Sequence, residues 1–87
     1  MRRRVVVHGR VQGVFFRDTV RRLALEQGVA GWARNNRDGT VEAVFEGPVE
    51  GVDRLVAFAR RGPRDALVER VEVFEEDDEG LGGFSIR

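Results

Sequence analysis

Apolar positions recur along the chain with two different periods, which predict alternating strands and helices. Residues 16–27 and a segment from Pro48 to Gly62 show the spacing of helices that are buried on one face. The expected core-facing positions are Phe16, Val20, Leu23 and Ala24 in the first helix and Val49, Val52, Leu55, Val56 and Ala59 in the second. Shorter stretches rich in β-branched residues are typical of strands, at 3–8, 29–35, 40–46 and 66–74, and residues 84–86 add a short edge strand.

Turn residues separate these elements. Asn36-Arg37-Asp38-Gly39 is a hairpin signal between two of the strands, Gly28 ends the first helix, and Gly62-Pro63 ends the second. The order is therefore βαββαβ with a short tail. We expect a single domain over residues 1–87, in the α+β class. The arrangement that fits this order is a ferredoxin-like sandwich with a mainly antiparallel sheet, two helices on one face and a short C-terminal edge strand.

This topology brings separated residues together. The first two strands run parallel, with the third inserted antiparallel between them, so their C-terminal ends lie at the same end of the sheet. The glycine-bounded loop from Gly9 to Phe15 leaves the first strand there, and Asn35 closes the second strand there. The first helix, which carries Arg17 near its start, also begins at this end.

Charge is balanced overall but unevenly distributed. The net charge is zero, yet residues 1–37 hold nine arginines and two acidic residues, whereas the remaining residues hold thirteen acidic residues and six arginines. An arginine-rich half is suited to a phosphate or a nucleic acid. Alternatively, the opposite charges interleave when the chain folds, and the composition leaves both options open. The acidic run at 75–79 is interpreted as a solvated loop.

The residue types that are missing narrow the chemistry. The chain contains no cysteine, lysine or tyrosine, and His8 is its single histidine. A thiolate or multi-histidine metal site and a Ser–His or Cys–His pair are therefore not supported. What remains at the predicted site is a glycine-bounded loop, a helix N-terminus, Arg17 and Asn35, a combination that suits an anion. Taken alone, the loop is also an ordinary strand-to-helix turn, and it lacks the spacing of a nucleotide-binding P-loop.

Two motifs carry a resemblance to a known family. GRVQGVFFR at 9–17 and GWARNNRDGTV at 31–41, with the closing FSIR, resemble the acylphosphatase family over the whole length. The resemblance implies hydrolysis of acyl phosphates to a carboxylate and inorganic phosphate, without metal or cofactor. It implies that Arg17 binds the phosphate and that Asn35 positions the attacking water. The phosphate-cradling loop would comprise Arg10, Val11, Gln12, Gly13, Val14 and Phe15, while Asn36 stands where relatives frequently have threonine.

Further expectations concern partners and location. The ligands would be a small acyl phosphate and, as product-like anions, inorganic phosphate or sulfate. No membrane span or signal peptide is indicated, so we expect a cytoplasmic protein that does not bind membranes. We also expect no nucleic-acid partner, and an intact small domain of this size suggests a monomer. His8 ends a strand beside the loop, where we expect a packing or hydrogen-bonding role.

Two alternatives come from other classes of protein. An RNA-recognition module shares the βαββαβ order but stacks bases on aromatic residues of its first and third strands, where this chain has only Phe45. The second alternative is a non-catalytic phosphate-binding module, or a domain of a larger enzyme that uses acyl or carbamoyl phosphate. The length, the initial methionine and the closing strand favour a stand-alone enzyme.

Overall fold

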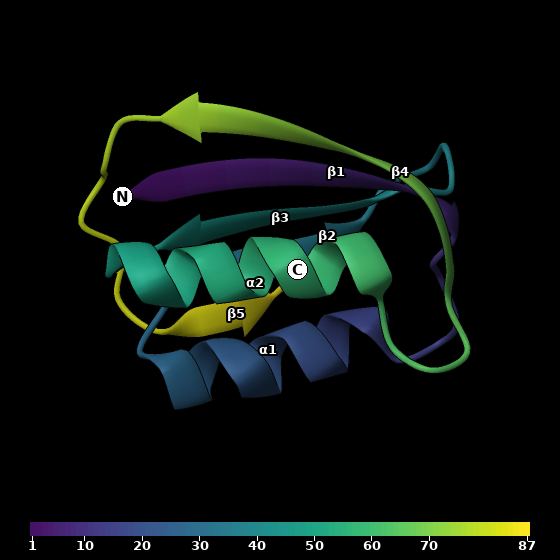
Figure 1. Ribbon diagram of the computed structural model, residues 1–87, viewed down its shortest axis with the longest axis horizontal. Helices are drawn as coiled ribbons and strands as arrows, with labels where there is room; N and C mark the ends of the chain where they lie inside the picture. The colour runs from purple at the N-terminus through teal and green to yellow at the C-terminus, as the bar shows by residue number, and fades with distance from the viewer.

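A computed structural model describes residues 1–87 and contains five strands and two helices (Figure 1). In chain order they are β1 (Arg2–Arg10), α1 (Phe16–Gln27), β2 (Ala30–Asn35), β3 (Val41–Glu46), α2 (Val49–Arg61), β4 (Leu67–Glu76) and β5 (Phe84–Ile86). Every element predicted from the apolar pattern is present, and the boundaries differ by no more than two residues. Neither helix is both long enough and apolar enough to span a membrane.

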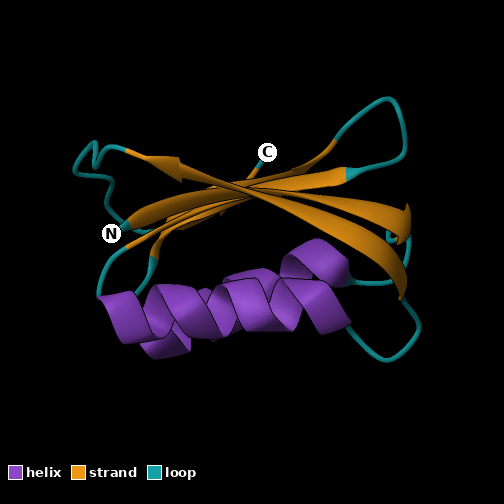
Figure 2. Ribbon diagram, turned by 45° about the horizontal axis from the view of Figure 1, so that its top comes forward, coloured by secondary structure: helices purple, strands orange, loops and turns teal.

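The strands form one mixed sheet in the order β4-β1-β3-β2-β5. Strand β3 pairs antiparallel with both β1 and β2, so β1 and β2 run parallel, and only β5 pairs parallel with its neighbour. The loop after β1 and the β2–β3 hairpin consequently lie at the same end of the sheet, on the right in Figure 1. Both helices cover one face (Figure 2), which confirms the predicted ferredoxin-like sandwich.

The core lies between the helices and the sheet. Its largest fully buried side chains include Phe45 and Leu55. Helix α1 buries three of its four predicted positions and half-buries Leu23. Helix α2 departs from the prediction at two positions. Val49, the first residue of the helix, is 53% exposed rather than buried. Phe58, which the prediction omitted, is buried and packs against Phe16 with ring centroids 6.0 Å apart.

The opposite face of the sheet carries a network of ion pairs. Its members are Arg2, Arg4, Arg34, Glu42, Glu46 and Glu76. Arg4 Nε lies 2.8 Å from Glu76 Oε2, and Arg34 Nη2 lies 2.8 Å from Glu42 Oε1. Arginines of the basic half thus pair with carboxylates of the acidic half, as the second interpretation of the charge pattern proposed.

The acidic run at 75–79 is not simply a solvated loop, so that expectation was wrong in part. Glu75 and Glu76 belong to β4, where the sheet register places them opposite Arg3 and Arg2. The backbone N–H groups of Glu79 and Leu81 donate to the buried Glu46 carboxylate, each at 2.8 Å. Because β4 pairs with β1, Glu75 and Glu76 lie opposite the arginines of β1 instead of in a loop.

Candidate active site

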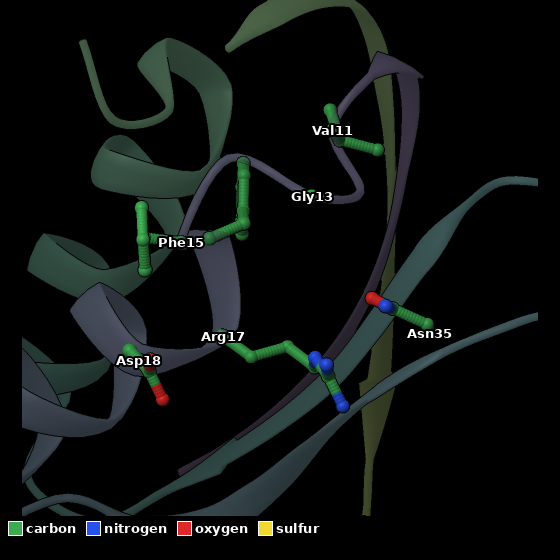
Figure 3. Close-up of a pocket in the computed structure, with 7 residues that line it drawn as sticks. Val11, Gly13, Phe15, Arg17, Asp18 and Asn35 are labelled. Carbon is green, nitrogen blue, oxygen red and sulfur yellow. The ribbon is translucent and has the colours of Figure 1, made fainter. Parts of the chain in front are cut away.

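One pocket lies where the first loop, the start of α1 and the end of β2 meet (Figure 3). Its volume is about 260 Å³, and it is lined by Val11, Gly13, Phe15, Phe16, Arg17, Asp18 and Asn35. Arg17 and Asn35, which are distant in sequence, therefore line the same small space. The side chains of both point into it from opposite walls.

The loop turns out of the sheet by using two glycines. The register between β1 and β4 shifts between His8 and Gly9. A Cβ atom on Gly9 would lie 2.1 Å from the backbone oxygen of Leu67, so no larger residue fits where the two strands approach. Gly13 takes a φ of 74° in open space, a conformation that glycine adopts at little cost. Val11 and Val14 are buried and hold the loop against the core.

The loop and the first turn of α1 present a row of unpaired backbone donors. None of the N–H groups of residues 11–18 donates to an acceptor within the protein, and the first helical bond is Thr19 N–H to Phe15 O at 3.1 Å. Phe15 is the N-cap residue and supplies no side-chain cap. Free N–H groups at a helix N-terminus carry partial positive charge, so this wall of the pocket attracts anions.

Arg17 adds a full positive charge to the same wall. It is the second residue of α1 and is half-buried. Its Nη1 donates to the backbone oxygen of Arg87 at 3.3 Å, and no carboxylate side chain forms an ion pair with it. Its guanidinium extends toward the side chain of Asn35 (Figure 3), so its remaining N–H groups are available to a ligand.

Asn35 faces this wall from the end of β2. Its side-chain amide makes no hydrogen bond within the protein and points into the pocket. The neighbouring hairpin is firmly held, because Asn36 Nδ2 donates to Thr40 Oγ1 at 3.0 Å and to Glu42 Oε1 at 3.2 Å. The Thr40 hydroxyl in turn donates to Asp38 Oδ1, and this bond lowers the pKa of the Asp38 carboxyl. Asn35 therefore presents a free amide from a rigid support.

Arg10 and Gln12 belong to the predicted phosphate-binding loop but do not line the pocket. Arg10 is the exposed last residue of β1, and Gln12 uses its side chain to bond the β2–β3 hairpin. Two lining residues, Phe16 and Asp18, were not predicted from the sequence as part of the site. Asp18 could have been predicted as part of the site because it directly follows Arg17 in the sequence. Its exposed carboxylate lies in the first turn of α1, where the helix dipole favours a negative charge.

His8 lies outside this pocket. Its Nε2 is 2.6 Å from Glu72 Oε1 of β4, in agreement with the expected hydrogen-bonding role. It lines a separate polar hollow together with Asp38 and Arg70. No group of three or more histidine, cysteine, aspartate or glutamate residues is arranged to hold a metal ion. The polar groups that line the Arg17 pocket are backbone N–H donors, the Arg17 guanidinium, the Asn35 amide and the Asp18 carboxylate.

The family model, the relatives and the solved structure that resemble this chain all have the same family description. The family model described as Acylphosphatase matches residues 3–86. An acylphosphatase from Haloarcula marismortui is 54% identical over 86 residues, which cover 99% of this chain and 94% of that protein. One from Rubrobacter xylanophilus is 56% identical, with 97% and 77% covered. The crystal structure of acylphosphatase from Bacillus subtilis superposes with a TM-score of 0.93 at 37% identity, covering 99% of this chain and 97% of the other.

Proposed function

This chain belongs to the acylphosphatase family and is an enzyme of that family, and from this premise we propose how its pocket hydrolyses acyl phosphates. The phosphoryl group is held by the loop N–H groups and Arg17, and the attacking water is held by Asn35. Residues 1–87 act as one domain, and all the groups that the reaction needs come from one copy of the chain. The observation that carries the proposal is the row of unpaired N–H groups beside Arg17 and opposite a free amide.

The phosphate-binding wall combines two kinds of donor. Backbone N–H groups at the start of α1 suit the oxygens of a phosphate, and they need no rearrangement because the loop is anchored by buried valines. The Arg17 guanidinium can donate two parallel hydrogen bonds, which fixes the orientation of the phosphoryl group as well as its position. Together these groups offset the charge on the phosphate oxygens as the bond to the leaving group breaks.

Asn35 has the properties needed to orient a water molecule. Its side-chain oxygen accepts a hydrogen bond from the water, although the amide is too weak a base to remove the proton. In the step we propose, the water oxygen forms a bond to phosphorus and the bond from phosphorus to the acyl oxygen breaks. The carboxylate leaves with the electron pair, and the water proton passes to a phosphate oxygen of the substrate. No side-chain base is therefore required.

The reaction barrier is low enough for a site that uses no side-chain base. A carboxylate is a good leaving group, so catalysis can rest on holding water and phosphorus in line and on stabilising charge. Stable phosphate monoesters lack such a leaving group and should react very poorly. The proposed step also uses no metal ion or cofactor.

An RNA-binding role has less support from the structure. Bases would have to stack on the open face of the sheet, but that face carries the arginine–glutamate network. Trp32 is only 9% exposed there, and the guanidinium groups of Arg34 and Arg87 lie over its ring. The surface that an RNA-recognition module uses is therefore occupied.

Phosphate release from acetyl phosphate, measured with and without excess chelator, tests the proposal directly. We expect equal rates under both conditions and almost no release from a stable alkyl monoester such as glycerol phosphate. Arg22→Ala, which changes an exposed arginine of α1 outside the pocket, is the matched control and should retain full activity. Inactivity toward acyl phosphates, or activity restored only by a divalent ion, would contradict the proposed mechanism.

A further inference from the structure

Phe15 has an unusual conformation for its residue type. Its side chain is 75% exposed, the largest exposed fraction among the large apolar residues of the chain. Its backbone has φ 61° and ψ 26°, and it is the only residue other than glycine with a positive φ. Bulky side chains rarely adopt this left-handed region, which asparagine and glycine adopt more readily. Neither burial nor capping of α1 accounts for a phenylalanine here, because its side chain does neither.

The next residue shows what an aromatic ring does when its role is packing. Phe16 is 3% exposed and contacts Phe58 in the core. Phe15 instead lines the pocket that contains Arg17 and Asn35. Because Phe15 is both largely exposed and part of the pocket wall, its ring lies at the mouth rather than at the inner end. Figure 3 shows residue Phe15 at the start of α1, across the pocket from Asn35. Strained residues of this kind often have a role in binding.

The size of the pocket indicates which part of the substrate lies next to the Phe15 ring. A volume of about 260 Å³ is below the roughly 300–1,000 Å³ of common small-molecule sites. A phosphoryl group bound to the loop N–H groups and Arg17 occupies the polar part of this space. The rest of the substrate must then extend outward through the mouth, where the Phe15 ring offers an apolar surface.

We propose that Phe15 is a specificity-determining residue that packs against the acyl group, and that the preferred substrates are acyl phosphates with an aromatic or other bulky apolar acyl group. This inference rests on the proposed function, because it assumes that the phosphoryl end binds at Arg17. An aromatic acyl group gains by stacking on the ring and by leaving water, whereas an acetyl group is too small to cover it.

The test compares benzoyl phosphate with acetyl phosphate in the wild-type protein and in Phe15→Asn. Asparagine tolerates the left-handed backbone, so the substitution removes the ring while the loop keeps its conformation. We expect kcat/KM for benzoyl phosphate to fall about tenfold more than kcat/KM for acetyl phosphate. Phe15→Tyr, which keeps a ring, should preserve the wild-type ratio. Leu25→Asn removes another exposed apolar side chain of α1, outside the pocket, and should also leave the ratio unchanged.

Two results would overturn the inference. In the first, the ratio of the two kcat/KM values stays the same in Phe15→Asn. In the second, both values fall together with a matching rise in the inhibition constant for phosphate, which would mean that Phe15 shapes the phosphate site rather than the acyl site. A wild-type protein that hydrolyses neither compound would instead contradict the proposed function, and the inference with it, so the two failures are distinguishable.

Discussion

The side-chain amide of Gln12 donates to the backbone oxygen of Asn36 at 2.7 Å and also to that of Thr40 at 3.0 Å. One side chain therefore fastens the loop to the β2–β3 hairpin. Asn35 directly precedes Asn36, so this contact fixes the separation between the loop N–H groups and the Asn35 amide. If these groups bind the phosphoryl group and the water, Gln12 keeps the two reactants at a fixed distance from each other.

Replacing Gln12 with alanine should affect stability and turnover together. Two part-buried carbonyl groups each lose one donor but keep a backbone N–H, from Gly39 for Asn36 and from Asn36 for Thr40. We therefore expect the free energy of unfolding to fall by about 1 kcal/mol. We also expect kcat to fall more than phosphate affinity, because the water and the phosphoryl group are no longer held at a fixed distance. Denaturant unfolding, steady-state kinetics and phosphate inhibition measure these quantities.

Gln27→Ala is the matched control for this change. Gln27 accepts a hydrogen bond from Arg54 Nη1 at 2.7 Å on an exposed surface away from the pocket. Its loss should change stability by less than about 0.5 kcal/mol and should leave kcat unaltered. If Gln12→Ala lost stability but kept the wild-type kcat, the contact would be structural only.

Asp18 places a negative charge in a pocket that we propose to bind an anion. Asp18→Asn should therefore tighten phosphate inhibition by about two- to fivefold, the range expected for an exposed charge pair of less than about 1 kcal/mol. The gain should shrink at high salt because exposed charges are screened. Inhibition constants at two ionic strengths provide the measurement, with Asp53→Asn on the exposed surface of α2 as the control. Weaker phosphate binding in Asp18→Asn would show that this carboxylate supports the site.

The ion-pair network predicts a loss of stability in acid. Burial by itself would raise the pKa of Glu42, but hydrogen bonds from Arg34 and Asn36 outweigh burial and hold the pKa below the ordinary value of 4.5. Hydrogen bonding from Arg4 likewise lowers the pKa of Glu76. Carboxyl groups with a lowered pKa in the folded state contribute stability that is complete above their ordinary pKa and is lost as the pH falls through the folded-state value.

We therefore expect the free energy of unfolding to be level near neutral pH and to decrease as the pH falls below about 4.5. Glu76→Gln should lower stability at neutral pH and reduce the acid dependence. Glu26→Gln, at an exposed glutamate of α1 without an ion pair, should leave the profile unchanged. Urea unfolding at several pH values measures the slope. A profile that stayed level or rose on acidification would contradict this account of the network.

The sequence was sufficient to predict the elements and their order, because the apolar periods and the turn residues are local signals. It was also sufficient to bring Arg17 and Asn35 to one end of the sheet, since topology alone decides where the first two strands end. Their roles in catalysis remain predictions until the variants are measured.

Other features depend on information that is not local. The pairing of Arg4 with Glu76 requires the register of β4 against β1. The contact from Gln12 to the hairpin requires the relative position of two loops, and the exposure of Phe15 requires its backbone dihedral angles. None of these follows from spacing along the chain, which is why the sequence indicated the proposed phosphate site but gave no sign of the proposed acyl-binding surface.

We propose that Arg17 binds the phosphoryl group whereas Asn35 holds only the water. The most direct measurement determines both phosphate affinity and kcat in Arg17→Ala and Asn35→Ala, with Arg22→Ala as the control. Arg17→Ala should lose phosphate affinity and turnover together, and Arg17→Lys should not restore them because an ammonium cannot reproduce the paired hydrogen bonds. Asn35→Ala should lower kcat about a hundredfold or more while phosphate affinity changes by less than about twofold. If Asn35→Ala weakened phosphate binding as severely as Arg17→Ala, Asn35 would be a phosphate ligand and the proposed division of roles would be wrong.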